Sequence, residues 1–308
     1  MASTQQIKGR IKSVKNTKQI TKAMELVSAS KMRRAQEATL ASRDYTLTAR
    51  QILTRLRELT DVSKHPLFVT REIKSRILIV ITSDRGLAGA YNANILRRLT
   101  KELQTDRDNN VKTELILIGK QAARFVSKVA DVHVLGAYQN MPERPALSDL
   151  SAVLQTIKSQ FVGTTELQTA NESGGKPKLV NVPPQVDAVD VLYTDYKSSV
   201  VQEVTLTGLL PAAFDGVRTS EDVADAIFEP SPKAVLDSVA DKLIDVQLWQ
   251  AFLESQASEQ SARMMAMKTA SDNAGDLIDD LTLAMNTARQ ASITQELAEI
   301  TGGAEAMK

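Results

Sequence analysis

Residues 231–300 decide the fold, and they read SPKAVLDSVADKLIDVQLWQAFLESQASEQSARMMAMKTASDNAGDLIDDLTLAMNTARQASITQELAEI. From Leu236 to Ala288, apolar or small residues recur at alternating steps of three and four positions. This spacing is the heptad seam of a helix that packs along another helix. The seam is interrupted by polar residues at Gln250, Gln260 and Ser271.

Both ends of this stretch carry helix boundary signals. Ser231 followed by Pro232 combines a side-chain N-cap with a proline at the first helical position. Gly302 and Gly303 predict the stop. Roughly 65–70 residues at about 1.5 Å each give a helix on the order of 100 Å long. We expect a helix of this length with one apolar seam to need a partner helix.

A second long helix is predicted from the start of the chain to about Leu59, with a length of roughly 80 Å. Ser3 to Gln6 has the spacing of a capping box, a seam begins at Ile7, and no proline occurs before Pro66. In its middle third the seam loses its large apolar residues. A second phase, through Ile20, Met24 and Val27, covers part of that gap. We therefore expect the buried face there to rotate or to be made of small residues.

The outer ends of the two helices carry opposite charge. Residues 1–36 are strongly basic, with Glu25 as their one acid, and residues 272–305 are strongly acidic, with Arg289 as their one base. Opposite charge on helices from opposite ends of a chain predicts an intramolecular antiparallel coiled coil. The alternative is that each end is only a solvated face.

Between the helices, short apolar runs alternate with helical patterns, which predicts a mostly parallel α/β sheet with Rossmann-like layering. Strands are expected at 76–82, 113–119, 132–135, 186–196 and 200–209, of which the last two are able to pair as a hairpin. Helices are expected at 94–104, at 120–129 and, capped by Ser148, at 148–161. Residues 163–185 read as a flexible surface loop and 211–229 as a partly helical linker. The predicted division is an N-terminal coiled-coil helix (1–60), an α/β domain (61–229) and a C-terminal coiled-coil helix (230–308).

Composition excludes several kinds of site. The chain has no cysteine, so thiol catalysis and cysteine-ligated metals are out. Its two histidines, His65 and His133, stand far apart, which disfavours a histidine metal site. No apolar run approaches the roughly 18 residues needed to span a bilayer, and the start shows no signal-peptide pattern. No catalytic, cofactor-binding or metal-binding residue is predicted.

The turn Asp84–Gly89 follows a strand and precedes a helix, where α/β proteins hold phosphates. It lacks the P-loop lysine and the three-glycine dinucleotide pattern, and Asp84 would repel a phosphate. We favour a structural turn; the alternative is a nucleotide-binding enzyme that uses Gly86–Gly89. A second alternative is a basic coiled-coil adaptor for nucleic acid, although the N-terminal helix has almost no aromatic residues for base stacking. Adjacent acids such as Asp279 and Asp280 point apart on a helix and read as a solvated face.

Four stretches together resemble the gamma subunit of F-type ATP synthases, in that family's order and over essentially the whole chain. They are IKSVKNTKQITKAMELVSASKM (11–32), TSDRGLAG (82–89), ARMMAMK (262–268) with DNA (272–274), and ARQASITQE (288–296). The resemblance is most specific at the two ends and loosest across 163–185.

The resemblance implies a rotor shaft with no active site and no cofactor. The coiled coil would sit inside a ring of alpha and beta subunits, and the α/β domain would stand on the c-ring beside epsilon. Rotation would couple proton flow through the c-ring to ATP synthesis, or ATP hydrolysis to reverse rotation. The implied partners are the alpha, beta, epsilon and c subunits, with no nucleic acid and no membrane span. The expected location is the cytoplasmic face of the bacterial plasma (inner) membrane, as a peripheral protein.

The resemblance also assigns contact residues. The residues expected to face the alpha/beta ring are Lys22, Met24, Arg263, Met267, Arg289, Gln290, Thr294 and Glu296. Among them, Arg263 and Met267 are expected to pack near Met24. The c-ring and epsilon side is assigned Arg43 and Tyr45, on a turn at 42–45, and Phe228 and Glu229, on the linker before the last helix.

Overall fold

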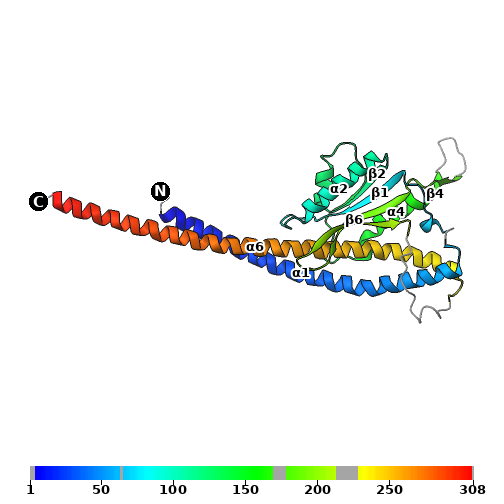
Figure 1. The fold of residues 1–308 in the computed structure, drawn as a ribbon, viewed down its shortest axis with the longest axis horizontal. Helices are drawn as coiled ribbons and strands as arrows, with labels where there is room; N and C mark the ends of the chain where they lie inside the picture. The colour runs from blue at the N-terminus through cyan, green and yellow to red at the C-terminus, as the bar shows by residue number, and fades with distance from the viewer. Residues whose placement is uncertain (1–3, 63–64, 169–177, 213–227, 307–308) are drawn as a thin grey trace. The chain divides into compact units, whose positions relative to one another are not determined.

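The structure is a computed structural model, and it describes residues 4–62, 65–168, 178–212 and 228–306 (Figure 1). The chain divides into two compact units. The sheet unit comprises Lys31–Ala262. The end unit comprises Met1–Ser30 together with Arg263–Lys308.

The sheet unit is built on a five-stranded sheet in the order β3-β2-β1-β6-β7. Its strands are β1 (Ser75–Ile81), β2 (Lys112–Ile118), β3 (His133–Tyr138), β6 (Ala188–Tyr196) and β7 (Gln202–Leu210). β1 pairs in parallel with β2 and β6, and β2 pairs in parallel with β3, while β6 and β7 are antiparallel. The predicted mostly parallel sheet, with its last two strands as a hairpin, is confirmed.

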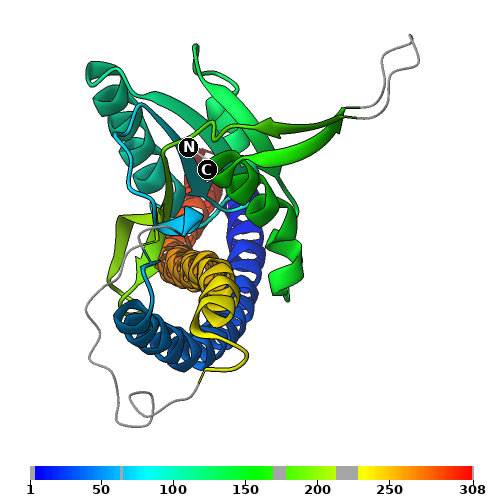
Figure 2. The same cartoon turned by 90° about the vertical axis from the view of Figure 1, so that its right-hand side faces the viewer.

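Alternate residues of β1 feed two separate cores, which makes the sheet the middle layer of this unit. On one face, Leu78 and Val80 pack with α2 (Tyr91–Asp108) and α3 (Lys120–Val126). On the other face, Ile77 and Ile79 pack with α4 (Ser151–Val162), the end of α1 and the first turns of α6. Figures 1 and 2 show these layers from two sides.

Several predicted bounds change. β3 continues three residues past its predicted end, and α2 begins three residues before its predicted start. The helix predicted from Ser148 begins instead as a 3-10 turn, η3 (Leu147–Leu150), and then continues as α4. Ser148 is not its cap, because the N–H of Ala146 donates to the carboxylate of Asp149 at 2.7 Å.

The prediction of a loop at 163–185 is wrong at both ends. β4 (Thr164–Gln168) and β5 (Lys178–Val182) pair antiparallel as a separate two-stranded sheet. Three of the six glycines and prolines in this segment lie between the two strands, at 169–177, outside the described residues. The strands themselves hold several β-branched residues, which favour extended backbone. The linker predicted at 211–229 also lies mostly outside the described residues.

Helix α1 spans Thr4–Leu59, as predicted. Its buried positions keep one phase throughout: Ile7, Ile11, Thr21, Ser28, Ala35, Thr39, Thr46, Ala49, Leu53 and Leu56. In the middle third these residues are small or hydroxylated, and the second phase is wrong, because Ile20 and Val27 are 60% and 54% exposed. Thr21 and Thr39 satisfy their buried hydroxyls by donating to carbonyls four residues earlier. The face is therefore narrow and does not rotate.

Helix α6 spans Pro232–Ala306. Its start is as predicted, since the N–H of Ala234 donates to Oγ of Ser231 at 3.2 Å. The predicted stop at Gly302 and Gly303 is wrong, because α6 continues through both. Neither glycine has the positive φ of a helix C-cap. Glycine costs about 1 kcal/mol relative to alanine inside a helix, which weakens the helix without ending it.

The two long helices run antiparallel to one another, as predicted (Figure 1). In the sheet unit, Thr46 of α1 donates its hydroxyl to Oε1 of Gln250 of α6 at 3.1 Å. In the end unit, Lys18 of α1 lies over Gly275 of α6, so closely that a Cβ there would be 2.8 Å from Nζ. Glycine at 275 thus leaves room for a long side chain of the partner helix.

Candidate partner-binding surfaces

The glycine turn after β1 is closed by its own hydrogen bonds. Asp84 accepts from the N–H of Lys120 at 3.0 Å and from the N–H of Met141 at 3.2 Å, one with each carboxylate oxygen. Ser83 donates its N–H to Oδ1 of Asn92 of α2 at 3.1 Å. Asp84, which follows β1, therefore links the end of β1 to the start of α3 and to the segment after β3. These contacts support the interpretation of the turn as structural.

A buried charge cluster at the start of β1 was not found from the sequence. Arg76 donates to Asp106 and Asp190 at 2.8 Å and to Glu102 at 3.3 Å. Burial alone would lower the pKa of Arg76, but Asp106 and Asp190 outweigh it and raise that pKa. Burial raises the pKa of Asp190 against the opposing effect of Arg76. A charged residue at the edge of an apolar strand run was the available signal. The cluster joins β1, β6 and α2, and its role is to hold the sheet unit together.

Buried serines of α6 form hydrogen bonds at the end of β6. Ser255, Ser258 and Ser261 are fully buried. Ser258 donates to the carbonyl of Thr194 at 3.1 Å, Ser261 donates to the carbonyl of Ser199 at 2.8 Å, and Ser255 shares a 2.7 Å hydrogen bond with the hydroxyl of Tyr91. Small side chains at steps of three allow close approach of a helix to a strand end. The heptad seam of α6 runs along the neighbouring face, so the sequence pattern did not point to these serines.

A polar network beside these serines links both long helices to the sheet. Gln250 accepts from Thr46 and donates to Glu254 at 3.0 Å. Glu254 is buried, and it lies close enough to Tyr193 of β6 to affect its titration. The pKa of Tyr193 is raised, first by burial and then by the charge of Glu254. Gln250, which interrupts the seam in sequence, is thus a bridge between α1 and α6.

The residues predicted to face the alpha/beta ring all belong to the end unit. Arg263 and Met267 are buried and Met24 is partly buried, whereas the remaining residues are exposed: Lys22, Arg289, Gln290, Thr294 and Glu296. Nζ of Lys22 donates to both carboxylate oxygens of Glu25 at 3.0 Å, on the same helix. Lys22 and the four residues near the end of α6 are therefore the part of the predicted set that presents surface in this chain.

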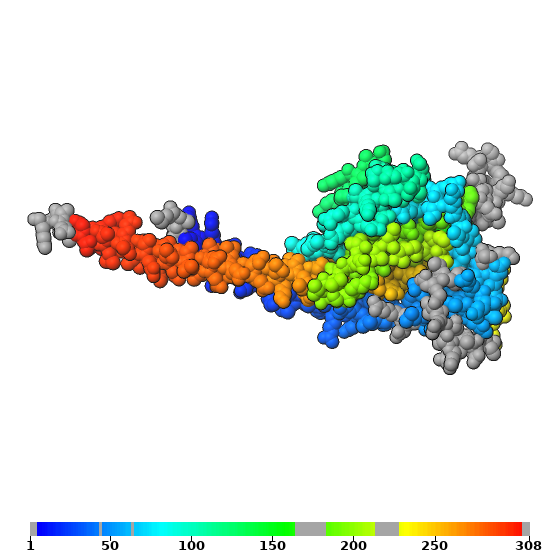
Figure 3. Space-filling view, viewed as in Figure 1, coloured from blue at the N-terminus to red at the C-terminus, as the bar shows by residue number. Residues whose placement is uncertain are grey.

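The last turns of α6 lie uncovered. Every residue from Arg289 to Gly303 is exposed, and these turns are the red part of Figure 3. Among them, Ile293, Leu297 and Ile300 are 50%, 58% and 68% exposed, and their spacing puts them on one side of the helix. An apolar stripe on an uncovered helix indicates a surface that a partner covers.

The residues predicted for the c-ring and epsilon side all lie in the sheet unit. The turn predicted at 42–45 is wrong, because these residues are inside α1, which has no proline or glycine there to break it. Tyr45 is 51% exposed, and the side chain of Arg43 lies outside the described side chains. Phe228 packs against the core that contains the start of α6, while its neighbour Glu229 is exposed. In the described part of the chain, no helix is both long enough and apolar enough to cross a membrane.

Known structures share this arrangement. A chain of the Euglena gracilis mitochondrial ATP synthase (OSCP/F1/c-ring, rotational state 3) matches with a TM-score of 0.65 at 19% identity, covering 99% of this chain and 94% of that one. A chain of the Tetrahymena thermophila mitochondrial ATP synthase central stalk and c-ring matches with a TM-score of 0.59 at 22% identity, covering 82% of this chain and 99% of that one. At these identities the likeness shows a common fold.

Sequence comparison gives the family. A family model described as ATP synthase matches residues 3–307. A protein of Opitutus terrae named ATP synthase gamma chain is 38% identical over 314 residues, which cover 97% of each chain. A protein of the same name from Haemophilus influenzae (strain PittEE) is 36% identical over 310 residues, which cover 100% of each chain. The chain therefore belongs to the ATP synthase gamma chain family.

Proposed function

We propose that this chain is the central rotor shaft of an F-type ATP synthase. In this role it couples proton flow through the c-ring to ATP synthesis in the alpha/beta ring, or ATP hydrolysis to reverse rotation. The observation that carries the proposal is the uncovered end of α6, residues 289–303, with its one-sided apolar stripe. An exposed helix end of this kind on a family member is suited to turn inside a surrounding ring. Family membership and the antiparallel helix pair support the same role.

The division of labour follows the three predicted parts. The coiled-coil helices, 1–60 and 230–308, enter the alpha/beta ring, and the α/β domain, 61–229, faces the c-ring and epsilon. The contacts with the ring are made by Lys22, Met24, Arg263, Met267, Arg289, Gln290, Thr294 and Glu296. Those with the c-ring and epsilon are made by Arg43, Tyr45, Phe228 and Glu229. Lys22 supports this assignment because its ammonium group lies on the surface, held by Glu25 alone among the contacts described for it.

The shaft drives catalysis without performing it. A rotor that presents a different side to each catalytic site biases that site toward a different conformation at each angle. Two helices of unequal length, 56 and 75 residues, supply such asymmetry. The chain itself supplies no reacting group in this proposal. It works as a peripheral subunit at the cytoplasmic face of a bacterial plasma (inner) membrane.

Reconstitution with alpha and beta subunits tests the proposal. ATP hydrolysis is measured with alpha and beta alone, with this chain added, and with a chain lacking residues 289–308. We expect steady multi-site hydrolysis only when the chain is present, and weaker hydrolysis with the truncated chain. A full chain that neither joins the ring nor changes its rate would contradict the proposal. Hydrolysis of ATP by the isolated chain would contradict its non-catalytic role.

A further inference from the structure

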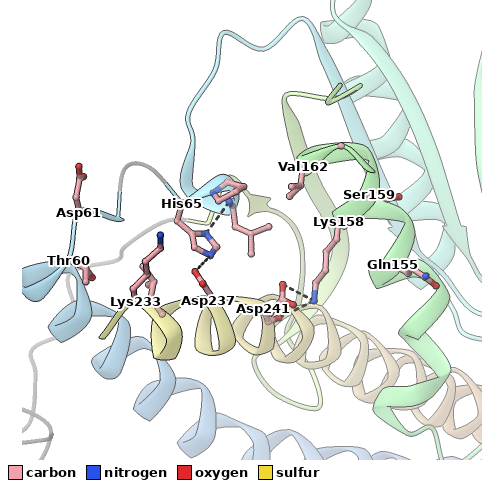
Figure 4. A pocket seen from close by; sticks show the side chains of 14 residues that line it. Thr60, Asp61, His65, Gln155, Lys158, Ser159, Val162, Lys233, Asp237 and Asp241 are labelled. Carbon is pink, nitrogen blue, oxygen red and sulfur yellow. Dashed lines mark hydrogen bonds and ion pairs between the residues drawn. The ribbon is translucent and has the colours of Figure 1, made fainter. Parts of the chain in front are cut away.

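The sheet unit contains a cavity of about 910 Å³. It lies where the end of α1, the 3-10 turn η2 (Pro66–Phe68), α4 and the first turns of α6 meet (Figure 4). Pockets that bind small molecules span about 300–1,000 Å³ and combine apolar walls with a few convergent polar groups. Here the apolar wall includes Leu67, Leu236 and Val162, the last of which is 36% exposed.

A histidine and an aspartate form one side of the cavity. Nε2 of His65 is 3.2 Å from Oδ1 of Asp237, and Nδ1 of His65 accepts from the N–H of Leu67 at 3.3 Å. Because Nδ1 accepts, the ring proton lies on Nε2 and points to Asp237. Burial lowers the pKa of His65, against the opposing effect of Asp237 and Asp241, which favours the neutral ring. A neutral His65 does not cancel the negative charge of Asp237.

A lysine shared by two aspartates forms the other side. Nζ of Lys158 is 2.7 Å from Oδ1 of Asp245 and 3.4 Å from Oδ1 of Asp241. One positive charge thus serves two carboxylates. The remaining charged residues of the lining, Asp61 and Lys233, have opposite signs. The lining together with Asp245 therefore holds more carboxylates than lysines, and most of these carboxylates lie on α6.

The two aspartates at the mouth are well placed to act together. Asp237 and Asp241 are four residues apart on α6, so their side chains lie on the same face one turn apart. Their side chains are 57% and 56% exposed. Oδ1 of Asp237 contacts His65, and Oδ1 of Asp241 contacts Lys158. A protonated amine between them would receive charge-assisted hydrogen bonds, which are roughly twice as strong as neutral ones.

We propose that this cavity binds an amphipathic organic cation, a protonated amine joined to an aromatic or aliphatic body. The amine lies between Asp237 and Asp241, and the body lies against Leu67, Val162 and Leu236. An occupant would touch α4, η2 and α6 together and so stabilise the folded chain. This inference stands apart from the rotor function, because it concerns the chain alone.

Binding to the purified full-length chain tests the proposal with matched probes. Tryptamine, tryptophol and indole-3-acetate share one ring system and differ in charge, being a cation, a neutral alcohol and an anion. We expect tryptamine to bind roughly tenfold or more tightly than tryptophol, and indole-3-acetate not to bind, in calorimetric titrations at pH 7. Equal affinity for the three probes, or no binding of tryptamine in the millimolar range, would overturn the proposal without any variant.

Two double variants locate the site. Asp237→Asn with Asp241→Asn should weaken tryptamine binding roughly tenfold or more and leave tryptophol binding nearly unchanged. Asp276→Asn with Asp280→Asn is the matched control, since these exposed aspartates have the same spacing on the same helix. The control should bind tryptamine as the wild type does. An equal loss in both variants would show attraction to general negative charge and overturn the assigned site.

Discussion

The hydroxyl of Thr46 donates to Oε1 of Gln250 at 3.1 Å and joins α1 to α6 inside the sheet unit. Gln250 in turn donates its side-chain N–H to the buried carboxylate of Glu254 at 3.0 Å. The same Thr46 proton is shared with the carbonyl of Ser42, 3.0 Å from Oγ1, in the contact that helical threonines commonly make. Gln250 is therefore the more connected residue of the pair, because it also donates to a buried carboxylate.

Replacing Gln250 tests this asymmetry. We expect Gln250→Leu to lower the free energy of unfolding by about 1–3 kcal/mol, although it improves the heptad pattern, because Glu254 loses a donor in a buried place. Thr46→Val removes one neutral hydrogen bond and should cost about 0.5–1.5 kcal/mol. Urea unfolding of the full chain measures both. A leucine variant more stable than the wild type would show that the seam prefers an apolar residue there.

Arg76 is expected to be the most sensitive charged residue of the sheet unit. Arg76→Met leaves Asp106, Glu102 and Asp190 without their shared cation in a buried site, so we expect a loss of about 3–5 kcal/mol in the free energy of unfolding. Arg98→Met is the control, since Arg98 also pairs with Glu102 but has a side chain 42% exposed, and it should cost less than about 1 kcal/mol. Similar losses in the two variants would contradict the role given to burial.

Two glycines offer a matched test of backbone geometry. Gly119, at the end of β2, has φ of +99°, and a Cβ there would be 2.2 Å from the carbonyl oxygen of Thr82. Gly86, in the turn after β1, has open space around it. We expect Gly119→Ala to destabilise the chain by more than about 2 kcal/mol and Gly86→Ala to stay within about 0.5 kcal/mol. Thermal unfolding followed by circular dichroism distinguishes them. A large loss of stability at Gly86 would contradict the open space found around that residue.

The start of β1 should show a pH-dependent contribution. Burial would raise the pKa of Asp187, but the N–H groups of Lys74 and Ser75 and the Ser75 hydroxyl outweigh it and lower that pKa. An acid with a lowered pKa stabilises the fold above its unfolded-state pKa and loses this effect as pH falls through its folded-state pKa. We therefore expect Asp187→Asn to be destabilising at pH 7, and its difference from the wild type to shrink below about pH 4. A difference constant from pH 7 to pH 3 would exclude this ionisation effect.

Periodicity predicted the large features because they depend on many residues at once. The long helices and the parallel order of strands follow from repeated apolar positions, so no single residue could mislead the prediction. Errors arose where one or two residues were taken as decisive. Gly302 and Gly303 suggested a stop that the helix ignores, and Ser148 suggested a cap that Asp149 supplies from the next position.

Contacts between distant residues were beyond reach of the sequence. Ser258 reaches the carbonyl of Thr194, and His65 reaches Asp237, across long separations in the chain. Each partner is an ordinary surface-type residue, and only the fold brings the pair together. The cavity at His65 was missed for the same reason. In the sequence, His65 has no ionisable neighbour that would indicate a site. Its partner Asp237 lies on α6, and only the fold brings the two together.

The apolar stripe at the end of α6 gives the most direct test of the rotor proposal. We expect a triple change of Ile293, Leu297 and Ile300 to serine to leave the thermal unfolding of the isolated chain nearly unchanged, because exposed side chains contribute little to folding. In the complex with alpha and beta subunits, the same change should lower ATP hydrolysis or weaken assembly several-fold, since a partner covers that stripe. Val200→Ser, at a 75% exposed apolar residue between β6 and β7, is the control and should leave hydrolysis by that complex unaltered. If the triple variant assembled and hydrolysed ATP as the wild type does, the stripe would not be a ring contact, and the observation that carries the rotor proposal would be lost.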